Sequence, residues 1–195
     1  LVDSGGQYLD GTTDITRTVA VGNPNNFIKK MFTLVLKGHI ALSLAHFPEG
    51  IAGQSLDTFA RQYLWNEGLD FEHGTGHGVG CYLNVHEGPH GIGKGVNKIP
   101  FKEGMVVSNE PGYYRENEFG IRLENLIYVK RVKDVDGKKL LGFENLTFVP
   151  FDTRLMNIAL LTNTEKNWIN NYHREVLEKV GPHLEGSTFQ WMKKA

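Results

Sequence analysis

The chain has 195 residues, of which 40% are hydrophobic and 22% are charged, so it is long enough to bury one core and ordinary for a globular protein. Its formal net charge of -1 provides no basic field for nucleic acid or an anionic membrane, and we expect neither as a partner. Its single cysteine, Cys81, excludes an internal disulfide framework and favours a reducing compartment, which predicts a cytoplasmic protein.

The first half of the chain predicts a hairpin followed by two helices. Apolar and β-branched residues flank the turn-prone Asp10-Gly11, so residues 1–22 are expected to form a β-hairpin. Apolar positions at helical spacing predict a helix over 27–46, and Ser55 is expected to be the N-cap of a second helix. The chain begins without Met and inside an expected strand, which predicts an internal fragment of a longer protein.

The second half combines a glycine-rich region with further strands. Four of the eight histidines fall in the glycine-rich region 72–112. Strands are expected over 120–132 and 146–151, with a polar turn at 134–139 between them.

The end of the chain predicts one more helix and a short tail. Thr164 is expected to cap this helix, and Gly181-Pro182 is expected to end it. We therefore expect one domain over 1–182 and a C-terminal tail over 183–195. Helices and strands are mixed without regular βαβ alternation, which predicts an α/β protein of the α+β kind, with an antiparallel or mixed sheet backed by helices.

Two aspartates lie on opposite arms of the expected hairpin. Asp3 and Asp14 would be within about 5 Å of each other if they were cross-strand neighbours. Carboxylates at that distance repel each other unless a cation or a shared proton intervenes. For this pair alone, two solvated turn residues remain the alternative.

Alternating glycines surround a histidine in the segment HGTGHGVG, residues 73–80. They remove side chains around His77 and allow other backbone segments to approach closely. A nucleotide-binding loop is disfavoured, because the segment lacks the GxGxxG spacing. A lone core histidine would not require this setting, so His77 is a candidate functional residue.

Two glutamates follow the glycine-rich segment. Glu124 lies in a run that is typical of a buried strand, where a carboxylate requires a partner charge or a metal ion. Arg122 would share its face of the strand, either as a simple ion-pair partner or as part of the same site. With Glu110 and the residues above, the candidates are four carboxylates and one imidazole, a ligand set that suits Mn²⁺, Co²⁺ or Zn²⁺. Four negative charges in one pocket require about two divalent cations.

Four motifs follow one another along the chain: LVDSGGQYLDGTTDITRT, HGTGHGVGCYLNVHEGP, NEPGYY and GIRLENL. In this order they resemble the motifs of the pita-bread metallopeptidases, and nearly the whole chain is similar to the C-terminal catalytic domain of the long, cytosolic aminopeptidases P. The resemblance implies a curved antiparallel sheet with helices on its outer face. It also implies that residues 1–182 are a catalytic domain truncated at its N-terminal edge, because family members have further elements and another active-site histidine upstream of Asp3.

The resemblance further implies a dinuclear metal site. Asp3 would ligate one ion, Asp14 and Glu124 would bridge both, and His77 and Glu110 would complete the shell of the other. Two Mn²⁺ ions are expected, with Co²⁺ or Zn²⁺ as alternatives. The implied reaction is hydrolysis of the bond between an N-terminal residue and a following proline by a hydroxide that bridges the metals.

The implied catalytic residues are His73, His86 and Glu110. The two histidines would contact the substrate carbonyl and the proline side of the scissile bond, and Glu110 would handle the proton of the bridging water. The expected partners are peptides with an N-terminal Xaa-Pro sequence and a second copy of the chain in a homodimer.

Two alternatives remain for the function. A prolidase, which cleaves Xaa-Pro dipeptides, would share the five ligands, but its segment before the second histidine is usually shorter than the one at 81–85. A pita-bread module that only binds proteins would have lost metal ligands, and this chain retains all five.

Overall fold

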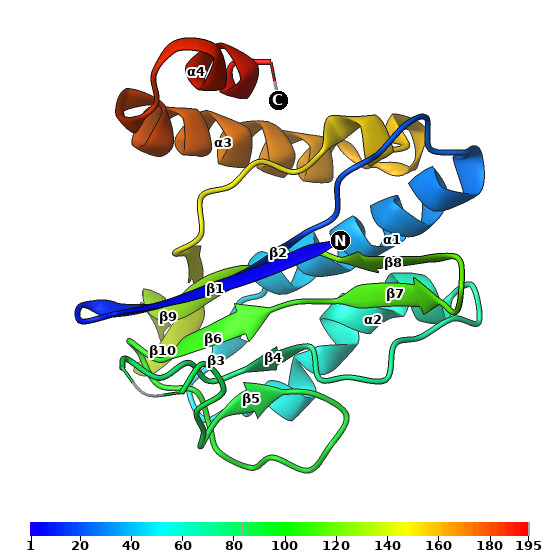
Figure 1. Cartoon of the computed structure of the whole chain (residues 1–195). Helices are drawn as coiled ribbons and strands as arrows, with labels where there is room; N and C mark the ends of the chain where they lie inside the picture. The colour runs from blue at the N-terminus through cyan, green and yellow to red at the C-terminus, as the bar shows by residue number, and fades with distance from the viewer. Residues whose placement is uncertain (83, 195) are drawn as a thin grey trace.

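The computed structural model describes residues 1–82 and 84–194 and is shown in Figure 1. Two residues mentioned above lie outside the described residues: Leu83, in the segment 81–85, and Ala195, at the end of the expected tail.

The chain begins with the predicted hairpin. Strand β1 (Val2–Tyr8) pairs antiparallel with β2 (Gly11–Arg17), and the pairing of Tyr8 with Gly11 leaves Leu9 and Asp10 as the turn. The hairpin is confirmed, with the turn one residue earlier than its sequence suggests. In Figure 1 the blue hairpin lies across the strands that follow later in the chain.

Two helices follow the hairpin. Helix α1 (Asn26–Ser43) confirms the expected helix, and the side chain of its N-cap Asn25 accepts a hydrogen bond from the backbone N–H of Ile28. Helix α2 (Asp57–Trp65) is preceded by a 3₁₀ turn, Gly53–Ser55. Ser55 is therefore not the N-cap, which is Leu56, because the 3₁₀ turn carries the chain directly into the helix.

The last long helix is α3 (Asn163–Val180). Its N-cap is Thr162 and not the predicted Thr164, because Thr162 forms a reciprocal capping box with Glu165, whose side chain accepts from the backbone N–H of Thr162. The helix ends before Gly181-Pro182, as predicted. The tail contains a short helix, α4 (Gly186–Met192), after the 3₁₀ turn Gly181–His183.

Among the described residues, the strands pair antiparallel in four sheets. A four-stranded sheet has the order β3-β10-β9-β6, and β1-β2, β4-β5 and β7-β8 are two-stranded. The strands not yet defined are β3 (Phe47–Pro48), β4 (Gly76–His77), β5 (Gly91–Ile92), β6 (Val106–Asn109), β7 (Gly112–Arg115), β8 (Phe119–Arg122), β9 (Asn125–Val135) and β10 (Lys138–Asn145).

Two predictions about these strands are wrong. The expected strand 120–132 is interrupted at Leu123-Glu124, between β8 and β9. The expected strand 146–151 is irregular, and the ladder strand is β10 instead. The reason is that Arg17 and Tyr172 hydrogen-bond the carbonyl groups of this irregular segment in place of a neighbouring strand. The predicted polar turn is confirmed and narrows to Asp136-Gly137, both at positive φ.

Helices α1 and α2 lie behind the strands in Figure 1, and α3 runs along one edge. One hydrophobic cluster joins α1 to α3 and to β8, and a second lies between α1, α2 and the four-stranded sheet. The predicted α+β class is confirmed by this arrangement. Within the described residues, no helix is both long and apolar enough to cross a membrane. The prediction of a separate tail over 183–195 stays a prediction.

Candidate metal site

Two glutamates lie where the long β-hairpin of residues 106–128 is interrupted. The last pair of one ladder is Asn109 with Asn125, and the first pair of the next is Gly112 with Arg122. Pro111 has no N–H to donate, so the ladder cannot continue through it. Glu110 and Glu124 therefore lie opposite each other in the gap between the two ladders.

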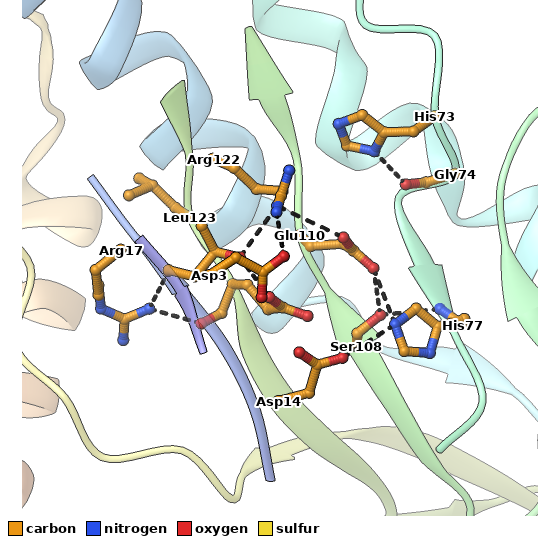
Figure 2. Close-up of polar contacts among 12 residues, drawn as sticks. Asp3, Asp14, Arg17, His73, Gly74, His77, Ser108, Glu110, Arg122 and Leu123 are labelled. Atoms are coloured by element: carbon orange, nitrogen blue, oxygen red, sulfur yellow. Dashed lines mark hydrogen bonds and ion pairs between the residues drawn. The ribbon is translucent and has the colours of Figure 1, made fainter. Parts of the chain in front are cut away.

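One pocket of about 320 Å³ brings the predicted residues together; we call it the acidic pocket. Its lining residues are Asp3, Gly5, Asp14, His77, Val85, His86, Glu110 and Glu124. Three sets of possible ligand atoms each lie within 4.8 Å of one another: Asp3, Asp14 and Glu124; His77, Glu110 and Glu124; Asp14, His77 and His86. Figure 2 shows several of these side chains pointing toward one another.

The hairpin brings its two aspartates to one face, although they are not direct cross-strand partners. Asp3 is paired with Thr16, and Asp14 is paired with Gly5. The two carboxylates are thus diagonal neighbours on the same side of the ladder. This relationship is close enough for both to reach the acidic pocket.

His77 is held by the glycine-rich segment and β6. Its backbone N–H donates to Ser108 Oγ over 2.9 Å, and a Cβ added at the preceding Gly76 would overlap the Ser108 carbonyl oxygen. Its Nδ1 is 2.9 Å from the Gly78 carbonyl, so Nδ1–H donates there and Nε2 faces the acidic pocket. Nε2 lies 3.2 Å from Glu110 and 3.4 Å from Asp14, yet it has no aligned hydrogen-bond partner among the described residues.

The electrostatics of the acidic pocket favour a cation. Burial raises the pKa of Glu124, and the nearby carboxylates of Glu110, Asp14 and Asp3 raise it further, to about 8. Burial lowers the pKa of His77, but the close carboxylates of Asp14 and Glu110 outweigh burial and raise that pKa to about 10. Both shifts mean that positive charge between these groups is stabilised.

Arg122 makes a different ion pair from the one suggested by its sequence position. Its Nη2 is 2.5 Å from Asp3 Oδ2, and its Nε donates to Thr16 Oγ1 over 3.0 Å. Thr16 in turn donates to Glu124 over 2.7 Å, so the hydroxyl group lies between the arginine and that glutamate. Of the two alternatives for Arg122, the direct pair with Glu124 is therefore not formed, and both residues belong to one site through Thr16. Figure 2 shows Arg122 beside Asp3 and Glu110.

The two other predicted histidines occupy different positions. The ring of His86 lies 4.0 Å from the ring of His77 and lines the acidic pocket. His73 is outside the lining of the acidic pocket, and its Nε2 is 2.7 Å from the hydroxyl group of Tyr114. Tyr114 also accepts a hydrogen bond from Arg122 over 3.1 Å, which links His73 indirectly to Asp3.

Several residues that support the site were not identified from the sequence. Tyr114 and Thr16 lie inside two of the quoted motifs, and a polar residue within a strand was the available clue. Asp57 and Arg61 lie on α2, far from any motif, and form an ion pair of 2.6 Å beneath the glycine-rich segment. Thr75 joins this pair through a hydrogen bond of 2.5 Å to Asp57.

The donor set in the acidic pocket fits divalent metal ions. The carboxylates supply hard oxygen ligands, and one imidazole nitrogen faces them. Metal-binding histidines commonly donate their other N–H to a carbonyl group, as His77 does to Gly78. The unpartnered Nε2 of His77 is thus oriented as a ligand would be.

Comparisons with known proteins agree with this chemistry. Residues 1–131 match the model of metallopeptidase family M24, and residues 139–195 match the C-terminal region of peptidase M24. The chain is 54% identical over 201 residues to a probable Xaa-Pro aminopeptidase P of Arthroderma gypseum, a match covering 100% of this chain and 32% of that protein. The chain therefore spans about a third of the length of this curated relative.

Solved structures have the same fold. An X-prolyl aminopeptidase from Caenorhabditis elegans, described as a cytosolic enzyme with a di-nuclear active site, overlaps with a TM-score of 0.93 at 47% identity, over 99% of this chain and 32% of that one. An Xaa-Pro dipeptidase from Bacillus anthracis overlaps with a TM-score of 0.63 at 30% identity, over 77% of this chain and 39% of that one. The predicted pita-bread fold, a curved antiparallel sheet with helices on its outer face, is confirmed by these overlaps.

Proposed function

The chain belongs to metallopeptidase family M24, and from this premise we propose that it is the catalytic core of an aminopeptidase that removes an N-terminal residue preceding proline. The observation that carries the proposal is the convergence of four carboxylates and one unpartnered imidazole nitrogen in the acidic pocket. The proposal includes two divalent metal ions held by Asp3, Asp14, His77, Glu110 and Glu124. When bound, such ions lower the pKa of a water molecule and polarise the scissile carbonyl.

The chain's own residues would handle the substrate and its protons. Glu110 accepts a hydrogen bond from Ser108 over 2.8 Å and lies beside His77, so its carboxylate is positioned to take a proton from the attacking water. His86 lines the acidic pocket with an exposed ring and would donate a proton to the leaving nitrogen. His73 lies at the far end of the Tyr114–Arg122 network and would hydrogen-bond the substrate carbonyl.

Specificity for proline follows from the chemistry of the bond. A bond preceding proline is a tertiary amide without an N–H group. The enzyme must therefore hold the free amine of the substrate and recognise the pyrrolidine ring. Carboxylates of the acidic pocket would bind the amine, and His86 would lie near the ring.

The proposal favours an aminopeptidase over a prolidase. A relative that matches 100% of this chain at 54% identity is named Xaa-Pro aminopeptidase P, and the X-prolyl aminopeptidase structure overlaps 99% of it with a TM-score of 0.93, against 0.63 for the dipeptidase. A binding module without catalysis remains the contrasting class, and the metal content of the protein distinguishes it from an enzyme.

Several finer points are also part of the proposal. We infer that the metal is Mn²⁺, with Co²⁺ or Zn²⁺ as alternatives, that the protein is cytoplasmic and that it forms a homodimer. We also infer that residues 1–182 form the catalytic domain and that 183–195 form a tail.

The test measures metal content and cleavage in the complete natural protein. Glu124→Ala should lose both ions, because a bridging ligand serves both and its loss leaves the other carboxylates poorly arranged. Glu118→Ala removes a half-exposed carboxylate outside the acidic pocket and is the matched control, with metal content unchanged. The protein should also cleave an Arg-Pro-Pro peptide and leave an Arg-Ala-Pro peptide nearly intact.

Full metal occupancy in Glu124→Ala would overturn the ligand assignment. Comparable rates on the two peptides would overturn the proline specificity and leave the metallopeptidase assignment standing.

A further inference from the structure

A buried arginine lies directly beneath the acidic pocket. Arg17 is only 7% exposed, and its Nη1 donates to the carbonyl groups of Glu124 over 2.6 Å and Thr16 over 3.0 Å. Its Nη2 donates to Asn125 Oδ1 over 2.7 Å and to the hydroxyl group of Tyr172 over 2.9 Å. Among the described residues, no carboxylate lies within ion-pair distance of this guanidinium group.

The gap between β8 and β9 explains why Glu124 needs such a partner. Backbone groups outside a ladder must find other hydrogen bonds when they are buried. The N–H groups of Leu123 and Glu124 donate to the carbonyl groups of Pro111 and Thr16. The Leu123 carbonyl accepts from His39, and the Glu124 carbonyl accepts from Arg17. The peptide unit that carries the Glu124 side chain is thus fixed by Arg17.

Arg17 is itself held by the C-terminal part of the chain. Tyr172 of α3 is 3% exposed, and its hydroxyl group accepts from Arg17 and lies 3.0 Å from the carbonyl oxygens of Thr147 and Val149. Arg17 also donates to the Val149 carbonyl over 2.7 Å and stacks on the ring of Phe151, 4.2 Å from its centroid. All these C-terminal contacts lie within residues 139–195, the region matched by a separate family model.

We propose that Arg17 and Tyr172 are positioning residues for Glu124, through which residues 139–195 set the geometry of the metal site. The inference rests on the proposed metal-binding function. The path is short: the hydroxyl group of Tyr172 orients the guanidinium group of Arg17, which orients the peptide of Glu124. Residues that orient a metal ligand without touching the metal typically change metal affinity by about tenfold to a hundredfold when they are replaced.

The experiment uses Tyr172→Phe in the complete natural protein, because this change removes one hydroxyl group and keeps the ring in the core. Co²⁺ alone is the probe, titrated by calorimetry and followed by its visible absorption spectrum. Tyr172→Phe should weaken Co²⁺ binding by about tenfold and change the spectrum. The spectrum reports ligand geometry, which a general loss of stability would not alter in the folded protein.

Glu165→Gln is the matched control on the same helix. Glu165 pairs with Lys37 over 2.7 Å at the start of α3 and contacts neither Arg17 nor the lining of the acidic pocket. The Glu165→Gln variant should have a lower free energy of unfolding. Its Co²⁺ affinity should stay within about twofold of the wild type, because Glu165 lies away from the metal site and the two effects are independent.

Three outcomes would overturn the inference. Tyr172→Phe with wild-type affinity and spectrum would show that the hydroxyl group does not act on the site. If Glu165→Gln weakened Co²⁺ binding as much as Tyr172→Phe does, the weaker binding would be explained by a general loss of stability. A wild-type protein that binds no Co²⁺, Mn²⁺ or Zn²⁺ would overturn the proposed function as well, which distinguishes the two failures.

Discussion

Two buried arginines support the two sides of the acidic pocket, and their partners differ in charge. Arg61 lies beneath the glycine-rich segment, and it is fully buried, with ion pairs of 2.6 Å to Asp57 and 2.7 Å to Asp70. It also donates to the carbonyl groups of Phe71 and His73. Arg17 lies beneath Glu124 and has only neutral oxygen atoms as hydrogen-bond partners among the described residues.

The charge of Arg61 belongs to a structural ion pair, whereas the charge of Arg17 lies next to the metal ligand Glu124 of the proposed site. The charge of Arg61 is compensated by the carboxylates of Asp57 and Asp70. Burial lowers the pKa of Arg17, while Tyr172 and the nearby Glu124 carboxylate act in the opposite direction. Within the acidic pocket, Glu124 is therefore the carboxylate that acts on the charge of Arg17, and we expect changes at Arg17 to affect that pocket more than changes at Arg61.

The largest effect is expected from Arg61→Met. The change leaves Asp57, which is 3% exposed, without its cation, and breaking a buried pair in this way costs about 3–5 kcal/mol of unfolding free energy. Urea unfolding of the wild type and the variant measures this difference. Adding Asp57→Asn to the variant should recover part of the loss, because it removes the unpaired charge. A loss below about 1 kcal/mol would indicate that the pair behaves like a surface ion pair.

A second test concerns a buried histidine whose pKa is lowered by burial and by the charge of Arg17. His39 is fully buried, and burial together with the charge of Arg17 lowers its pKa from 6.5 to about 3. Below pH 6.5 the unfolded chain binds a proton that the native chain excludes, so the stability from neutral His39 is present above pH 6.5 and is lost progressively down to about pH 3.

His39→Asn retains an N–H group near the position of Nδ1 and does not titrate. Between pH 6.5 and pH 3, the unfolding free energy of the variant should fall less steeply than that of the wild type, by up to about 1.4 kcal/mol per pH unit. Denaturant unfolding at several pH values gives both slopes. Parallel curves for the two proteins would mean that His39 is already protonated in the native state.

The smallest effect, and the most selective, is expected from a pair of conservative changes. Arg17→Lys and Arg61→Lys both keep the charge and lose the planar fork of donors. Arg17→Lys should weaken Co²⁺ binding by about tenfold, because the Glu124 carbonyl loses its well-oriented partner. Arg61→Lys should reduce stability and change Co²⁺ affinity by less than about threefold. Equal losses of affinity in the two variants would remove the distinction between the arginines.

The sequence predicted the parts of the molecule whose signals are local. The hairpin, α1 and the end of α3 follow from turn residues, apolar spacing and Gly181-Pro182. The motifs also identified six residues that line the acidic pocket: Asp3, Asp14, His77, His86, Glu110 and Glu124. Their roles as ligands and catalytic groups stay predictions.

The parts that could not be predicted depend on contacts between distant residues. Arg17 and Tyr172 are 155 positions apart, and no periodicity relates a polar residue in a strand to a tyrosine in a helix. The interruption at Leu123-Glu124 was hidden because its composition is that of a buried strand. Proximity in sequence offered Glu124 as an ion-pair partner of Arg122, whereas the fold brings Asp3 to it.

The position of β1 and β2 has a consequence for how the chain folds. Thr16 bonds Glu124 across 108 positions, and Arg122 bonds Asp3 across 119. Closing loops of this length is entropically costly, and contacts of high sequence separation generally form late in folding. The acidic pocket therefore does not exist in any partly folded chain whose hairpin has not yet docked. A chain that has formed its helices and its four-stranded sheet still lacks two of the four carboxylates at this place.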